Sequence, residues 1–183
     1  MKKVCFLLCL AVTAMLAGCV FTAHKQHQTH TYDLNLPIKP QTQNVFVVTA
    51  FANDTPSRSR MLYRQTDNSI VQDPYNSWIQ SPERLLQRHY MLAFPLQGNV
   101  KTSELAELRC SVTAFEFDLQ KSEAHLVFNY TLRKDEQRFA GTICAMEKIS
   151  NPSSQACAEA MSKAAAQAAG KLWQEVKKFT AKK

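Results

Sequence analysis

Glycine is scarce in this chain, which has only four glycines among 183 residues. Glycine-rich loops hold nucleotide phosphates because their backbone N–H groups can approach the ligand closely, so the scarcity argues against a P-loop or a GxGxxG site. The sequence also contains no GxSxG nucleophile elbow, no HExxH zinc motif and no CxxC pair. We therefore expect a binding or structural protein that is not an enzyme and needs no cofactor and no metal.

The titratable side chains give no catalytic set either. Glu116 and Asp118 lie two residues apart on one face of an expected strand and could pair as carboxylates, but a solvated sheet edge explains them better. His89 shares the apolar face of an expected helix, where a core histidine is more common than a ligand. His125 stands at the start of a strand and has no predicted partner.

The N-terminal apolar run extends from Val4 to Ala17 and follows Lys2 and Lys3. It is too short to span a bilayer as a stable helix, and its basic start and small final residues are typical of a secretory signal peptide. Leu16-Ala17-Gly18-Cys19 resembles the bacterial lipobox. An ordinary signal peptide that happens to contain a cysteine is the alternative.

The lipobox resemblance implies cleavage between Gly18 and Cys19 and a covalent lipid, such as diacylglycerol and palmitate, on Cys19. Each buried methylene contributes about 0.8 kcal/mol, so several chains form a durable anchor. Val20, rather than aspartate, follows Cys19. The enterobacterial sorting rule then implies the inner leaflet of the outer membrane, facing the periplasm.

The domain organisation follows from this signal. We expect a signal peptide at 1–18, a lipidated N-terminus and tether at 19–31, a single domain at 32–179 and a basic tail at 180–183. Loss of the two signal lysines lowers the formal net charge from +7 to +5, and export argues against nucleic acid as a partner. His24, His27 and His30 could gather a metal if the tether became helical, but a polar spacer is the better interpretation.

The hydrophobic pattern predicts a single α+β domain. Period-two alternation is clearest from His125 to Arg133, and a polar link is expected at 65–77. We predict a mainly antiparallel sheet with a C-terminal meander and a bulge near Ala114, packed by two helices. The strands are expected at 44–51, 60–64, 105–119, 125–133 and 138–146, and the helices at about 82–94 and 154–178.

Three cysteines remain in the domain, and three thiols allow one bridge. Cys144 is near the end of the last strand and Cys157 is in the first turns of the next helix, so we predict a Cys144–Cys157 disulfide. Cys110 lies on a strand that is not expected to pair with the strand of Cys144. The alternative is three buried free thiols.

Several segments, in the same order along the chain, resemble the ABC-type transport auxiliary lipoproteins, the family of PqiC (YmbA). Tyr32-Asp33-Leu34 is similar to the family's YxL opening, and Tyr75-Asn76-Ser77-Trp78 is similar to its Y..W element before a helix. Residues 60–64 (RMLYR) and Ala160-Met161-Ser162 are similar to a strand and a helix start of the family. The resemblance covers about residues 31–178. The histidine-rich tether and the cysteines depart from the family's pattern.

The resemblance implies a non-catalytic docking component of an MCE-type (PqiB-like) intermembrane lipid transport system. Its partner would be an MCE-domain protein, and the chain could form a homo-oligomeric ring. Exposed aromatic residues often anchor interfaces, so Tyr63, Tyr75 and Trp78 are the candidate partner interface, the last two in an expected loop. Trp78 could instead fill the core, and the strand of Tyr63 favours the core for that residue.

A second function remains open: a lipoprotein that regulates or scaffolds envelope assembly, in cell-wall synthesis or outer-membrane protein insertion. Such a role favours a tether long enough to cross the peptidoglycan. The tether here has about a dozen residues and reaches at most ~40 Å. That length favours a docking role close to the membrane.

Overall fold

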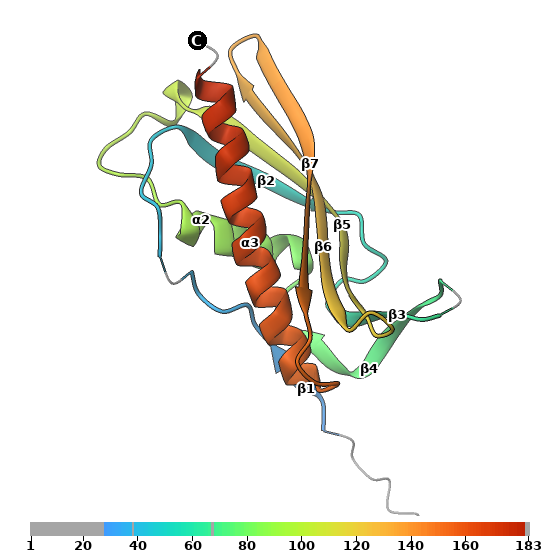
Figure 1. Cartoon of the computed structure of the whole chain (residues 1–183). Helices are drawn as coiled ribbons and strands as arrows, with labels where there is room; N and C mark the ends of the chain where they lie inside the picture. Colours follow the sequence, from blue (N-terminus) through green and yellow to red (C-terminus); the bar gives the residue numbers. More distant parts are fainter. Residues whose placement is uncertain (1–27, 38, 67, 182–183) are drawn as a thin grey trace, which may run out of the picture.

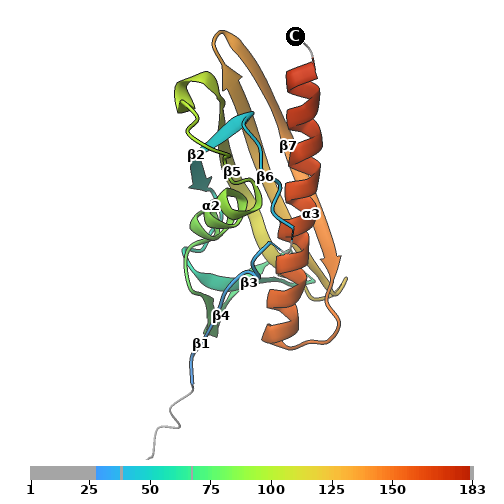
Figure 2. The ribbon, with the colours of Figure 1, turned by 90° about the vertical axis from the view of Figure 1, so that its left-hand side faces the viewer.

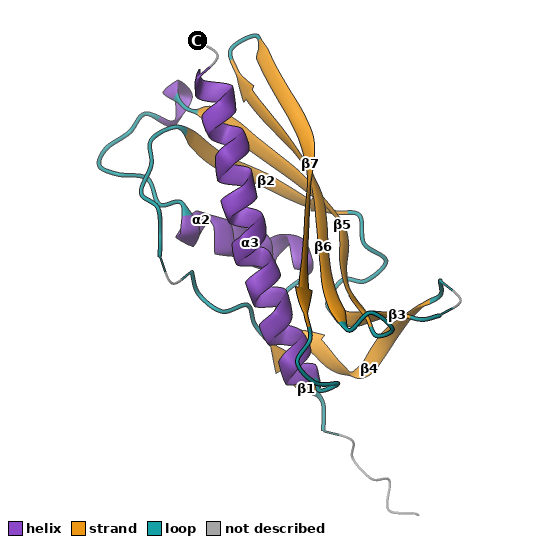
Figure 3. Ribbon diagram, viewed as in Figure 1, coloured by secondary structure: helices purple, strands orange, loops and turns teal. Residues whose placement is uncertain are grey.

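Seven strands and two helices form the domain in the computed structural model, which describes residues 28–37, 39–66 and 68–181 (Figure 1, Figure 3). The expected α+β class with two helices is confirmed. The elements in chain order are β1 (His30–Tyr32), β2 (Phe46–Asn53), β3 (Arg60–Arg64), β4 (Ile70–Trp78), α2 (Pro82–Ala93), a 3₁₀ turn (Thr102–Glu104), β5 (Ala106–Asp118), β6 (Glu123–Lys134), β7 (Gln137–Lys148) and α3 (Ser154–Ala181).

The C-terminal meander is confirmed. β6 pairs antiparallel with β5 on one side and with β7 on the other. Its alternation places Leu126, Phe128 and Tyr130 in the core, as the period-two pattern predicted. The β5–β6 register shifts between Val112 and Ala114, so the predicted bulge is present.

The sheet also contains three parallel pairings that the sequence pattern did not indicate. Two strands lie along the edge of β5 that faces away from β6. β2 pairs with the first half of β5, for example Phe46 with Ala106. β3 pairs with the end of β5, where Tyr63 is opposite Phe117. The third parallel pair joins β1 to β4, which is antiparallel to β3. These pairings extend the meander into a mixed sheet with the order β1-β4-β3-β5-β6-β7, with β2 also on β5.

The expected polar link at 65–77 is wrong, because most of it is strand β4. Asp73-Pro74 does not end the strand. The Asp73 Oδ1 atom accepts hydrogen bonds from the backbone N–H groups of Tyr75 at 2.8 Å and Asn76 at 2.9 Å, which holds an irregular segment inside the strand. The register with β3 shifts there. The sheet also begins earlier than expected, since His30 already pairs with Asn76.

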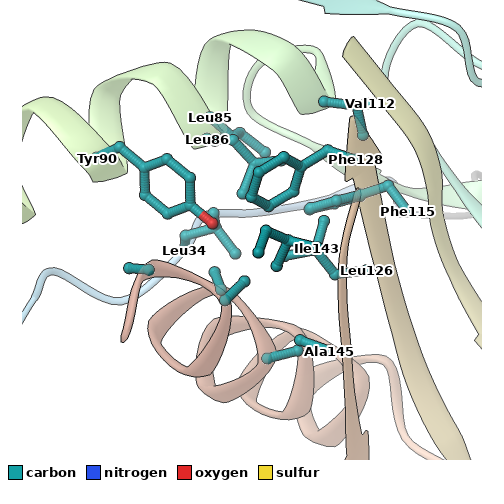
Figure 4. Packing of buried hydrophobic residues seen from close by; sticks show 14 of the residues in the cluster. Leu34, Leu85, Leu86, Tyr90, Val112, Phe115, Leu126, Phe128, Ile143 and Ala145 are labelled. Atoms are coloured by element: carbon teal, nitrogen blue, oxygen red, sulfur yellow. The ribbon is translucent and has the colours of Figure 1, made fainter. Parts of the chain in front are cut away.

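Both helices pack on one face of the sheet (Figure 2), and α2 runs crosswise behind α3 in the view of Figure 1. The core lies between the helices and the sheet, where Tyr90 of α2 meets Phe128 of β6 with 5.8 Å between ring centroids (Figure 4). α3 presents mainly alanines to the sheet, and small side chains allow a close approach. It begins where the Ser153 hydroxyl accepts a hydrogen bond from the Ala156 N–H at 3.1 Å, and it continues to Ala181.

The start of α2 agrees with the sequence only in part. Pro82 occupies the first turn, where proline is favoured, and Glu83 lies near the positive end of the helix dipole. The Ser81 hydroxyl, however, donates to the Glu83 carboxylate and makes no capping bond to the backbone. Glu83 therefore holds the Ser81 side chain away from the backbone N–H groups of the first turn.

Candidate functional site

Trp78, one of the three candidate interface residues, belongs to the core. It ends strand β4 and is only 2% exposed. Its ring packs edge-on against Phe115 at 5.0 Å and tilted against Phe117 at 6.2 Å. The core alternative for Trp78 is thus confirmed, and its predicted place in a loop is wrong.

Tyr63 is half-buried on β3, as its strand pattern favoured. Its ring lies 5.5 Å from that of Phe117, and its hydroxyl is 3.7 Å from the Met61 sulfur. Burial raises the pKa of Tyr63 well above its usual value, so the phenol stays neutral at physiological pH. Its ring supports the sheet and offers little surface to a partner.

Tyr75 is the member of the predicted interface that is exposed, at 41%. It lies on the irregular segment of β4, where Arg60 donates a 2.6 Å hydrogen bond to the Pro74 carbonyl. Val71 on the same strand and Ile79 directly after it are exposed too. We call Val71, Tyr75 and Ile79 the β4 surface. Apolar side chains on such a rigid strand can anchor a partner without first being ordered.

The β4 surface lies at the end of the domain where the described chain enters. β1 runs along β4, and the Ile79 N–H donates to the Tyr32 carbonyl at 2.8 Å. The C-terminal end of α3 is at the opposite end of the domain (Figure 1). Gly18 and Cys19 lie outside the described residues.

The predicted Cys144–Cys157 disulfide is not formed. Cys157 is buried on α3, whereas Cys144 is exposed on β7. Its neighbours Ile143 and Ala145 face the helices, so alternation directs the Cys144 side chain to the other face of the sheet. Cys110 is also a free thiol, and burial raises the pKa of Cys157 to about 11, which keeps it protonated and unreactive.

Glu116 and Asp118 are not on a solvated edge, because both are 5% exposed at the end of β5. Each has its own partner. The Glu116 Oε1 atom accepts a hydrogen bond from Arg64 Nε at 2.6 Å, and Asp118 accepts one from the Lys121 N–H at 3.0 Å. This separate pairing gives a structural role to both carboxylates.

His89 is buried on α2, as predicted for a core histidine, but its Nε2 atom has no hydrogen-bond partner. Burial lowers the pKa of His89, against a weaker opposing effect of a hydrogen bond to the Asn35 backbone. Among the described residues, no three His, Cys, Asp or Glu side chains gather as metal ligands, and no helix has the length and apolarity to cross a bilayer. His24 and His27 lie outside those residues.

The structure contains a groove that the sequence analysis did not predict. A groove between α2, α3 and residues 35–37, 39 and 41 is lined by the half-buried Trp173 and the exposed Leu36. Trp173 and Lys177 are four residues apart, and each directly follows a residue of the apolar stripe, Leu172 or Val176. This spacing places Trp173 and Lys177 side by side on α3, and it was the sequence signal that could have indicated the groove.

Comparisons with known proteins give matches at the level of fold. No family model and no curated protein matches the sequence. The crystal structure of an uncharacterized protein is similar with a TM-score of 0.68 and 14% identity, and the match covers 81% of this chain and 99% of that one. A DUF330 protein from Xanthomonas campestris is similar with a TM-score of 0.61 and 16% identity, over 84% of this chain and all of that one.

DUF330 is the family of PqiC and YmbA, which the sequence motifs resemble. At these identities the likeness concerns the fold. The chain thus has the α+β fold of a DUF330 protein over most of its length.

Proposed function

We propose that this chain is an outer-membrane lipoprotein that faces the periplasm and serves as a non-catalytic docking component of an MCE-type, PqiB-like intermembrane lipid transport system. The observation that carries the proposal is the fold shared with a DUF330 protein over 84% of this chain. The lipobox before Cys19 and the ordered Tyr/Trp motifs support the same family independently.

The β4 surface is the proposed docking site. Tyr75 is 41% exposed, whereas Trp78 and Tyr63 are withdrawn into the fold, so the contact reduces to Tyr75 with Val71 and Ile79. The backbone beneath Tyr75 is held by Asp73 and Arg60. A tether of about a dozen residues keeps this end of the domain within ~40 Å of the anchor. A ring of several copies would repeat the surface around a central opening.

The lipid anchor has its own test. Metabolic labelling with palmitate should mark the wild-type protein and fail to mark Cys19→Ser, which should appear in the soluble periplasmic fraction. Val20→Asp should keep the label but move the protein to the inner membrane. Labelling of Cys19→Ser would refute the assignment of the lipidated residue.

Docking is tested by placing a photo-crosslinking phenylalanine analogue at position 75 in cells. Arg138, exposed in the β6–β7 hairpin at the other end of the domain, is the matched control position. We expect an MCE-domain protein to be captured from position 75 and not from position 138. Capture of cell-wall synthases or of the outer-membrane insertion machinery from position 75 would favour the envelope-assembly function.

A further inference from the structure

The groove between the two helices has the dimensions of a ligand site. Its volume is about 630 Å³, within the range of small-molecule sites. The lining residues of α3 run from Ser162 to Lys177, a distance of ~22 Å at 1.5 Å per residue. One leaflet of a bilayer is ~15 Å deep, half of the hydrocarbon core. The groove is therefore long enough for an acyl chain.

The floor of the groove is apolar and open. Ala166, Ala169 and Gly170 of α3 leave room above the helix, and a Cβ atom added to Gly170 would meet nothing within 4 Å. Trp173 stacks on Phe94 at 5.8 Å and closes one side. Leu36, which also lines the groove, is 69% exposed. An apolar ligand would remove this surface from water.

The charges around the groove have one sign. Lys39, Lys163 and Lys177 line it, and its lining contains no aspartate or glutamate. Within the part of the chain that the structure describes, none of these lysines forms an ion pair, although the Lys177 ammonium lies 5.7 Å from the Trp173 ring centroid. Unpaired lysines beside an apolar floor complement a ligand that is anionic at one end.

Two lining side chains carry buried nitrogens without partners. His89 is 4% exposed, and its Nε2 atom makes no hydrogen bond. The Trp173 indole N–H is also buried and unpaired. Four other buried polar atoms of the described residues are unpaired as well, among them the Trp78 indole nitrogen and the Tyr90 hydroxyl. These two nitrogens therefore lie beneath the groove surface and do not by themselves indicate a ligand.

We propose that this groove binds the acyl chain of a single anionic amphiphile, with the chain over Ala166 and Gly170 and the headgroup among Lys39, Lys163 and Lys177. The apolar floor distinguishes this ligand from an acidic peptide, which would need backbone partners along its length. The proposal goes beyond the docking role, and either one can fail without the other.

The test uses the mature chain without lipid, Cys19→Ser, so that no covalent acyl group competes for the groove. The sequence has two tryptophans, and Trp78→Phe leaves Trp173 as the sole fluorophore. The probe is dibrominated stearate below its micelle concentration, because bromine quenches a tryptophan that it touches. The glycerol monoester of the same acid is the uncharged control. We expect saturable quenching of Trp173 and weaker binding of the ester.

Gly170→Leu should fill the groove and weaken binding of the acid by at least about tenfold. It should fold, because the site is open and glycine is a poor helix former. Gln167→Leu, exposed on the same helix outside the groove, should bind as the parent does. Lys163→Glu with Lys177→Glu should weaken the acid more than the ester.

Three results would overturn the proposal. The first is an unquenched Trp173, and the second is equal binding by Gly170→Leu and Gln167→Leu. The third is equal affinity for acid and ester, which would indicate a merely apolar surface. A change in molar mass on Gly170→Leu, without a change in quenching, would assign the groove to a second copy of the chain.

Discussion

Trp78→Ala separates a core role from an interface role. The Trp78 ring is 2% exposed and packs against Phe115 and Phe117, so its removal leaves a cavity in the core. Truncation of such a residue costs about 3–5 kcal/mol, a large part of the about 5–15 kcal/mol that stabilises an ordinary domain. Tyr75→Ala, at a position 41% exposed, should cost less than about 1 kcal/mol.

The structure also predicts the effect of a milder change at the same position. The Trp78 Nε1 atom is buried without a hydrogen-bond partner, so the indole already carries a desolvation cost. Trp78→Phe keeps an aromatic ring and removes that unpaired N–H. We expect it to cost less than about 1.5 kcal/mol, well below Trp78→Ala.

The assay is urea unfolding of the non-lipidated mature chain, followed by circular dichroism so that the loss of a tryptophan does not change the signal. The order of stability should be wild type, Tyr75→Ala and Trp78→Phe close together, and Trp78→Ala far below. A Trp78→Ala variant as stable as Tyr75→Ala would refute the placement of Trp78 in the core.

Three further predictions concern stability. Arg64→Met should destabilise by about 2–3 kcal/mol because it leaves the buried Glu116 carboxylate unpaired, and adding Glu116→Gln should recover part of the loss in urea unfolding. Burial lowers the pKa of His89 in the folded state. The stability that the neutral His89 side chain contributes is therefore present above the unfolded pKa of about 6.5 and is lost as the pH falls below that value. The difference in unfolding free energy between wild type and His89→Gln should therefore shrink on acidification, and a constant difference would contradict the burial argument. Gly141→Ala places a Cβ atom 2.8 Å from the Tyr130 hydroxyl oxygen and should lower the thermal midpoint, whereas a side chain that moves aside freely would leave it unchanged.

Local sequence patterns correctly predicted the elements whose burial repeats with a single period along the chain. The alternation in β6 identified its buried face, and the helix expected at about 82–94 is α2. The change of phase near Ala114 indicated the bulge correctly. Each of these signals depends on neighbours in the sequence and on a single period of burial.

The pattern failed where distant contacts decide the structure. β4 contains Asp73-Pro74, which normally indicates a turn, and it is stabilised by β1 and β3 from elsewhere in the chain. The disulfide prediction considered how close Cys144 and Cys157 are along the chain, but not which face of β7 Cys144 occupies. Because Ile143 and Ala145 face inward, Cys144 must face outward. The groove depends on Leu36 and Trp173, which come together only after folding.

Distant contacts also separate Tyr75 from Trp78, which the sequence had placed together in a loop. Tyr75 and Trp78 are three residues apart, and in a loop both could have reached a partner. The strand and its irregular segment instead expose Tyr75 and bury Trp78. Sequence alone could not assign Tyr75 to the surface and Trp78 to the core.

The proposed docking of this chain to an intermembrane lipid conduit can be tested directly. The most direct measurement is affinity purification of the lipidated chain from native membranes, with mass spectrometry of the proteins that remain bound. Recovery of an MCE-domain protein, lost on Tyr75→Glu but retained on the control Arg138→Glu, is the predicted result. Recovery of cell-wall synthases or insertion machinery without any MCE-domain protein would contradict the account.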